Sequence, residues 1–135
     1  MRVVLDTNVL VASFITRGVC RDLVDHCIRR HHLLTSEFIL NEFREALMGK
    51  FRLAREQAED ATSLLRSRME VVTPTKLLGR VSRDASDDVV LGTAIAGGAA
   101  ILVTGDKDLL VLRRFGSIDI LSPADFPAYE AASPQ

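Results

Sequence analysis

Short apolar runs recur along the chain and predict strands. The first, the Arg-Val-Val-Leu run at 2–5, has no polar alternation, which is typical of a strand covered on both faces, and further runs fall at 32–34, 71–72, 101–103 and 118–121. Segments of helical length separate them, at about 8–14, 19–30, 36–49, 53–69, 87–97 and 106–113. This alternation predicts an α/β fold, a three-layer α/β/α sandwich with a central parallel sheet.

The chain has the size of one domain, at 135 residues, and no repeat or linker divides it. We expect a domain over 1–128 and a frayed C-terminal tail over 129–135, which is rich in Ala, Ser and Pro. The apolar stretch 3–15 is short and carries Asp6 and Asn8, so neither a signal peptide nor a membrane span is expected. Cys20 and Cys27, on one predicted helix, are expected to stay reduced, which favours a cytoplasmic protein.

Charge is distributed unevenly along the chain. The composition, 47% hydrophobic and 26% charged, excludes collagenous and disordered proteins. The net charge of -1 gives no indication of a polyanionic partner. Residues 1–83 nevertheless hold 14 basic against 10 acidic residues, whereas 84–135 hold 3 against 8. The near-neutral total is therefore an average over a mildly basic part and an acidic part.

Acidic residues follow two of the predicted strands. Asp6 follows the run at 2–5, and Asp106 follows the run at 101–103 after Thr104 and Gly105. Ligands of open parallel sheets bind outside the carboxyl ends of the strands, so these positions are candidates for a site. An Asp at such a junction can instead cap the next helix, and that alternative holds for each of them taken alone.

Two further acids border apolar helix faces. Glu42 lies beside a stripe formed by Ile39, Phe43 and Leu47, where the alternative to a site is a salt bridge to an Arg. Asp87 shares a helical face with the apolar residues that follow it, so it should point inward. We expect Asp84 or Asp88 as an accessory acid and Ser86 as the N-cap of this helix.

Asp6, Glu42, Asp87 and Asp106 would converge at one end of the sheet. Carboxylates at such separations repel one another unless a cation neutralises them. A donor set of oxygens alone suits a hard cation, Mg²⁺ or Mn²⁺. The chemistry that follows is metal-assisted hydrolysis, most naturally of a phosphodiester.

The motifs that carry these acids have a familiar order: Leu-Asp-Thr-Asn-Val-Leu at 5–10, Asn-Glu-Phe at 41–43, the acid cluster at 84–88, and Val-Thr-Gly-Asp-Lys-Asp-Leu-Leu at 103–110. In this respect the sequence resembles the PIN-domain ribonucleases, in particular the VapC-like toxins of prokaryotic toxin-antitoxin systems. The resemblance covers about 2–122. Relatives often have Asp-Pro-Asp-Asp where this chain has Asp-Ala-Ser-Asp-Asp, and the helical-face argument selects Asp87 among these aspartates.

The resemblance implies a fold and an activity. It places the catalytic and metal-binding acids at Asp6, Glu42, Asp87 and Asp106, with supporting roles for Asn8, Thr104, Asp88 and Asp108. It implies cleavage of single-stranded RNA with Mg²⁺ or Mn²⁺, control by a cognate antitoxin, and a homodimer. The chain would then be a metal-dependent endoribonuclease, the toxin of a type II toxin-antitoxin system.

Two alternatives stay open. One is a PIN-like binding module whose acids are structural. The other is a metal-dependent phosphatase or phosphotransfer domain, which would usually need a second acid two residues after Asp6, where this chain has Asn8.

Overall fold

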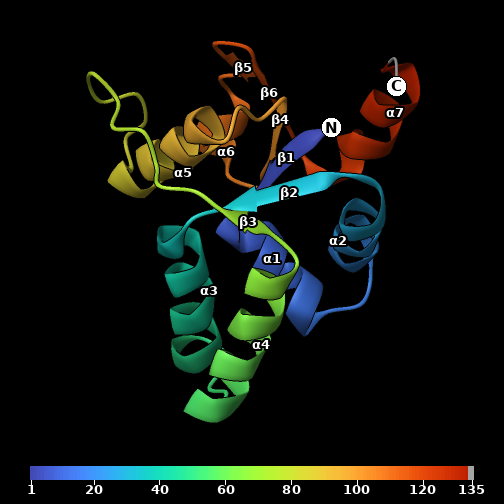
Figure 1. Ribbon diagram of the computed structural model, residues 1–135, viewed down its shortest axis with the longest axis vertical. Helices are drawn as coiled ribbons and strands as arrows, with labels where there is room; N and C mark the ends of the chain where they lie inside the picture. Colours follow the sequence, from blue (N-terminus) through green and yellow to red (C-terminus); the bar gives the residue numbers. More distant parts are fainter. Residues whose placement is uncertain (134–135) are drawn as a thin grey trace.

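The computed structural model describes residues 1–133 and contains a six-stranded sheet between layers of helices (Figure 1). The sheet order is β3-β2-β1-β4-β6-β5. Its strands are β1 Arg2–Leu5, β2 His32–Thr35, β3 Glu70–Val71, β4 Ile101–Val103, β5 Arg114–Phe115 and β6 Ile118–Leu121. All neighbours pair in parallel except β5 and β6. The predicted sandwich is confirmed, with all five expected strands present.

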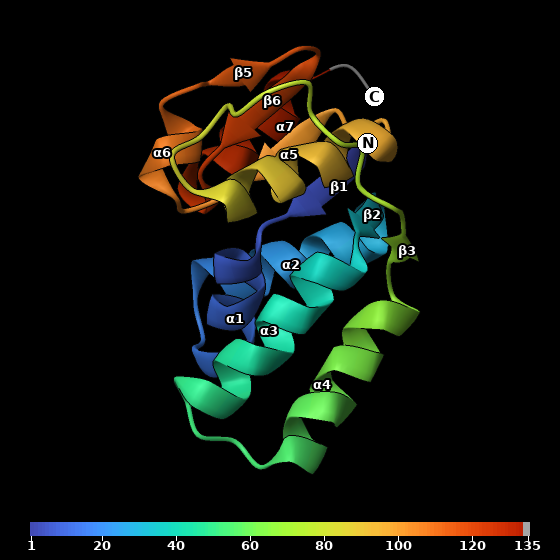
Figure 2. The ribbon, with the colours of Figure 1, turned by 90° about the vertical axis from the view of Figure 1, so that its left-hand side faces the viewer.

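Helices cover both faces of this sheet. They are α1 Thr7–Ile15, α2 Val19–Arg30, α3 Glu37–Gly49, α4 Arg55–Ser67, α5 Ala85–Ala96, α6 Lys107–Leu110 and α7 Phe126–Ala132, with a 3-10 turn at Pro123–Asp125. α5 packs on β1, β2 and β4 from one side, while α1, α2 and α3 pack together on the other. α4 packs on α3, and the two extend away from the sheet as a hairpin (Figure 2). Within residues 1–133, no helix has the length and apolar character that crossing a bilayer requires.

The central strands lie at the middle of the core. Val3, Val4 and Leu5 of β1 and all three residues of β4 are at most 1% exposed. Consecutive rather than alternating burial is what helices on both faces produce, and it explains the unbroken apolar runs in the sequence. These two buried strands form the rigid frame from which the acidic residues project.

A short hairpin replaces the end of the helix that was expected over 106–113. α6 ends at Leu110, and Arg113 and Gly116 adopt positive φ angles of 58° and 60° on either side of β5. Gly116 turns the chain from β5 directly into the antiparallel strand β6. A two-residue strand carries too little pattern to separate it from a helix end in the sequence.

The C-terminal tail is helical where fraying was expected. α7 continues to Ala132, because the hydroxyl of Tyr129 donates to Asp119 at 2.6 Å and the Glu130 carboxylate is bound by His26 and His31. Residues 129–132 thus form the end of a helix, at the start of the tail for which fraying was expected. Residues 134 and 135 lie outside the described part of the chain.

Candidate active site

The carboxyl ends of β1 and β4 meet at the centre of the sheet. From β1 the order runs to β2 and β3 on one side, and to β4 and β6 on the other. Ligands of open α/β sheets bind at such a reversal of strand order. A groove of about 510 Å³ lies there, and its walls include all four carboxylates expected from the sequence: Asp6, Glu42, Asp87 and Asp106.

Asp6 is held rigidly at the base of the groove. It is 5% exposed, and its Oδ1 accepts the backbone N–H of Thr7 at 2.7 Å, so it also caps α1. Burial raises the pKa of Asp6 above its ordinary value. The hydrogen bond from the Thr104 hydroxyl opposes that rise, as do those from Thr7 and Asn8, while the charge of Asp106 adds to it. The capping and site interpretations of Asp6 are thus compatible.

Asn8 and Thr104 lock the second oxygen of Asp6. Its Oδ2 accepts from Asn8 Nδ2 at 3.0 Å and from the Thr104 hydroxyl at 2.7 Å. Asn8 Oδ1 accepts the backbone N–H of Gly105 at 2.8 Å, and Thr104 accepts that of Asp106 at 3.0 Å. A side chain at Gly105 would place its Cβ 3.2 Å from Asn8 Oδ1, so glycine permits this close approach. These bonds tie the ends of β1 and β4 together.

Glu42 reaches the groove from α3. Its Oε1 accepts a hydrogen bond from the Thr7 hydroxyl at 2.8 Å, which links Glu42 to the side chain of the residue after Asp6. Burial raises the pKa of Glu42, the Thr7 bond opposes the rise, and the charges of Asp6 and Asp84 contribute to it. Glu42 therefore has a hydroxyl partner rather than the Arg that the alternative required. Thr7 was not expected among the site residues, although it stands between Asp6 and Asn8 in their motif.

Asp87 faces inward from the first turn of α5, as its helical position predicts. It is 5% exposed, and its Oδ2 accepts the Ser82 hydroxyl at 2.8 Å. The pKa of Asp87 is raised to about 6, first by burial and then by Asp106 and Asp6, while the Ser82 bond acts against the rise. Ser82 is a second residue that sequence reasoning missed, because it lies outside the quoted motifs.

Asp106, the N-cap of α6, and Asp108, in the first turn of α6, lie beside Asp87. Asp106 caps this helix by accepting the Asp108 N–H at 2.8 Å. One carboxylate oxygen from each of Asp87, Asp106 and Asp108 lies within 4.8 Å of the others. Asp108 also pairs with exposed Arg83 at 2.8 Å. The supporting residue Asp108 is therefore close enough to take part in one cluster with two of the main acids.

Asp84 and Asp88 occupy different places. Asp84, rather than Ser86, is the N-cap of α5, because its carboxylate accepts the Ser86 N–H at 2.9 Å, and it also lines the groove. Asp88 accepts the backbone N–H groups of Val81 and Ser82 at 3.1 and 2.8 Å and does not line the groove. Asp88 thus anchors the segment that presents Ser82 to Asp87.

The donor set fits a hard divalent cation. The groups that converge are carboxylate oxygens, and the pKa values of Asp6, Glu42 and Asp87 are all raised by burial together with neighbouring acids. A bound cation would relieve that repulsion and the cost of burying several negative charges. Mg²⁺ and Mn²⁺ prefer such oxygen ligands.

Comparison with known proteins identifies a family and solved structures with a similar fold. A family model described as PIN domain matches residues 2–108. No curated protein matches the chain. Among solved structures, VapBC2 of Rickettsia felis, bound to a DNA fragment from its promoter, matches with a TM-score of 0.65 at 17% identity, covering 90% of this chain and 98% of the other.

Two further solved structures match with similar extent. VapBC-1 of nontypeable Haemophilus influenzae has a TM-score of 0.65 at 18% identity, over 92% of this chain and 99% of the other. DNA-bound VapBC of Salmonella typhimurium has a TM-score of 0.61 at 18% identity, over 91% and 98%. At these identities the likeness establishes the shared fold.

Proposed function

Because this chain belongs to the PIN domain family, we propose that it is a metal-dependent endoribonuclease that hydrolyses single-stranded RNA. The proposal rests on one observation above all, the convergence of Asp6, Glu42, Asp87 and Asp106 on a single groove at the switch point of the sheet. A single nuclease domain would extend over 1–128. A binding module without catalysis would not need four carboxylates held in mutual repulsion.

Each acid has an assigned role and a residue that positions it. Asp6, Glu42, Asp87 and Asp106 would hold Mg²⁺ or Mn²⁺, with Asp108 assisting. When bound, this cation would supply an activated water and neutralise charge on the scissile phosphate. Asn8 and Thr104 fix both the position and the ionised form of Asp6 by donating to its Oδ2.

Two more hydroxyls complete this positioning. Thr7 orients Glu42, and Ser82 orients Asp87. Asp88 acts indirectly, because it holds the Ser82 segment in place through two backbone N–H groups. Most of these groups lie at the ends of buried strands or in the first turns of helices, while Glu42 lies in the second turn of α3 and Ser82 in the loop before α5. Because hydrogen bonds hold them in place, little rearrangement is needed at the moment of reaction.

The groove also has a means of attracting the substrate. Lys50 lies on its wall, opposite in charge to a phosphodiester backbone. A cation at this place would contact a phosphate beside the scissile bond without reading the base, which suits a polyanionic chain laid along the groove.

We further propose that the chain is the toxin of a type II pair, inhibited by a cognate antitoxin and dimeric. The likeness of its fold to the VapBC structures supports this extension. Expression of the chain with and without the product of a neighbouring small reading frame tests it. We expect growth arrest only without that product, and unaffected growth in both cases would contradict a toxin role.

The nuclease proposal is tested with a labelled single-stranded RNA and purified protein. We expect cleavage with Mg²⁺ or Mn²⁺, none with a chelator, and none by an Asp6→Asn variant. Absence of cleavage by the wild type with either metal, or equal cleavage by the variant, would favour the binding module instead. Release of inorganic phosphate from a small phosphomonoester without RNA cleavage would favour a phosphatase.

A further inference from the structure

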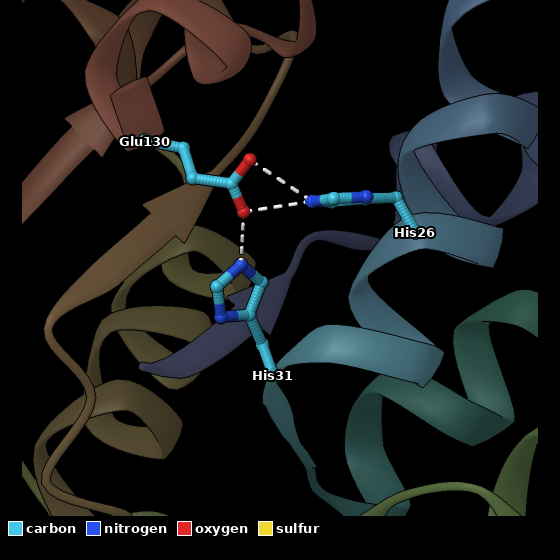
Figure 3. Close-up of side chains that lie close together, drawn as sticks. All are labelled: His26, His31 and Glu130. Atoms are coloured by element: carbon cyan, nitrogen blue, oxygen red, sulfur yellow. Dashed lines mark hydrogen bonds and ion pairs between the residues drawn. The ribbon is translucent and has the colours of Figure 1, made fainter. Parts of the chain in front are cut away.

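A second cluster of metal-ligating side chains lies at the opposite edge of the sheet from the acidic groove. His26 comes from α2, His31 from the residue that ends this helix, and Glu130 from α7 (Figure 3). His31 immediately precedes β2, so the cluster sits at the amino ends of the strands. It plays no part in the proposed nuclease site.

The three side chains point their ligand atoms at one place. Nε2 of His26 lies 2.7 and 2.9 Å from the two carboxylate oxygens of Glu130, and Nε2 of His31 contacts Oε2 of the same carboxylate (Figure 3). One ligand atom from each residue lies within 4.8 Å of the others. We propose that these three side chains form a binding site for Zn²⁺ that clamps α7 onto α2.

The chemistry of the donors selects the metal. Two imidazole nitrogens and one carboxylate oxygen are a borderline set that suits Zn²⁺ rather than Mg²⁺. In tetrahedral zinc sites with bonds near 2.0–2.1 Å, the ligand atoms are about 3.3 Å apart. The hydrogen-bonded contacts between His26 and Glu130 would therefore open by about 0.5 Å on metal binding. A side-chain rotation in partly exposed His26 and Glu130 supplies such a movement.

The surroundings of the cluster fit a site with one open position. The His31 side chain is 2% exposed, and buried Phe126 packs edge-on against both imidazoles, with ring centroids 6.4 Å from His26 and 5.8 Å from His31. A cavity of about 430 Å³ adjoins the three ligands. The rings are thus fixed on one side by an aromatic wall, while the other side has room for a water as fourth ligand.

Two basic groups border the site. Arg30 lines the adjoining cavity, and the Met1 amino nitrogen lies 3.0 Å from Nδ1 of His31. The Met1 contact holds the His31 ring with its Nε2 toward Glu130, which is the kind of outer contact that orients a metal-ligating histidine.

Calorimetric titration of the metal-free full chain with Zn²⁺, with Mg²⁺ in excess to fill the acidic groove, tests this proposal. We expect one equivalent to bind, and Co²⁺ in its place to give the intense visible absorption of a tetrahedral ion. His26→Ala and Glu130→Gln should each weaken zinc binding by more than about 100-fold. Zinc should also slow amide hydrogen exchange in α7 of the wild type and leave it unchanged in these variants.

Two controls separate this site from others. His32→Ala removes an exposed histidine that pairs with Glu70 at 2.6 Å, and Asp106→Asn alters the acidic groove; both should bind zinc like the wild type. Failure of the wild type to bind stoichiometric zinc would overturn the proposal. So would loss of binding in Asp106→Asn with full binding in His26→Ala and Glu130→Gln, which would assign zinc to the groove.

Discussion

The hydroxyl of Thr104 donates to Oδ2 of Asp6 at 2.7 Å, although 98 positions separate the two residues. The same hydroxyl accepts the backbone N–H of Asp106 at 3.0 Å. One side chain at the end of β4 therefore connects two of the four groove acids. It orients the first directly and the second through its backbone.

Thr104→Val removes this connection while keeping the shape of the side chain. We expect the free energy of unfolding to fall by about 1–3 kcal/mol, because a buried carboxylate loses a donor and a backbone N–H loses its acceptor. RNA cleavage should fall as well, since Asp6 is no longer fixed. Thr104→Ser keeps the hydroxyl, so it should retain most of the wild-type stability in urea denaturation and most of the wild-type activity in cleavage assays. A valine variant as active and stable as the wild type would refute the role of Thr104.

Asp87→Asn should relieve charge repulsion in the metal-free protein. Burial, Asp106 and Asp6 all disfavour the ionised form of Asp87, so the neutral amide should leave the melting temperature unchanged or raise it. The stabilisation that added Mn²⁺ gives should shrink, because a ligand is lost. Thermal melts with and without Mn²⁺ measure both effects. Exposed Asp60 on α4 provides the matched control, and equal Mn²⁺ stabilisation of wild type, Asp87→Asn and Asp60→Asn would place the metal elsewhere.

The stability of the metal-free protein should depend on pH through the same groups. Asp87 has its pKa raised from 3.8 to about 6, and Asp6 and Glu42 shift in the same direction. The folded state thus binds these protons more tightly than the unfolded state. The stabilisation that these bound protons give is present at low pH, and the part that comes from Asp87 is lost as the pH rises through about 6.

Urea denaturation in a chelator at pH 5, 6 and 7 measures this dependence. We expect the free energy of unfolding to decrease across the series by on the order of 1 kcal/mol, and saturating Mn²⁺ to abolish or reverse the decrease. Glu130 and Glu70 have lowered pKa values, so they make the free energy of unfolding increase with pH. Their effect falls below the pH range of this series. A metal-free protein that gains stability from pH 5 to 7 would contradict the repulsion inferred among the groove carboxylates.

Lys50 should contribute to RNA binding rather than to the chemical step. It is a basic residue on the groove wall, and its loss removes one phosphate contact. Lys50→Ala should raise KM several-fold with kcat nearly unchanged, and should reduce the slope of log affinity against log salt by about 0.7. Lys76, which lies outside the groove, offers a comparison for the loss of one positive charge. An unchanged salt slope would exclude a phosphate contact at Lys50.

Much of this architecture was predictable from the chain itself. The apolar runs located five strands, and the convergence of Asp6 and Asp106 followed from parallel strands ending at one edge. The inward position of Asp87 followed from its helical spacing relative to Val90 and Leu91. These are features that depend on local pattern and on one topological rule.

Other features depend on contacts between distant segments and could not be read from a pattern. Ser82 reaches Asp87 only because Asp88 folds the preceding loop back, and α7 is helical because Glu130 meets two histidines about a hundred residues earlier. The hairpin strand β5 is two residues long and leaves no periodicity. Tertiary contacts override weak local preference in each case.

The central claim is that the four groove carboxylates form one metal-dependent site for RNA cleavage. Single-turnover cleavage of a labelled single-stranded RNA at saturating Mn²⁺, with wild type, Asp106→Asn and Asp60→Asn compared at equal concentration, tests it most directly. We expect the wild type and Asp60→Asn to cleave at the same rate, and Asp106→Asn to be slower by at least about 100-fold, the scale of losing one positioned electrostatic group. Equal rates for Asp106→Asn and the wild type would contradict the claim.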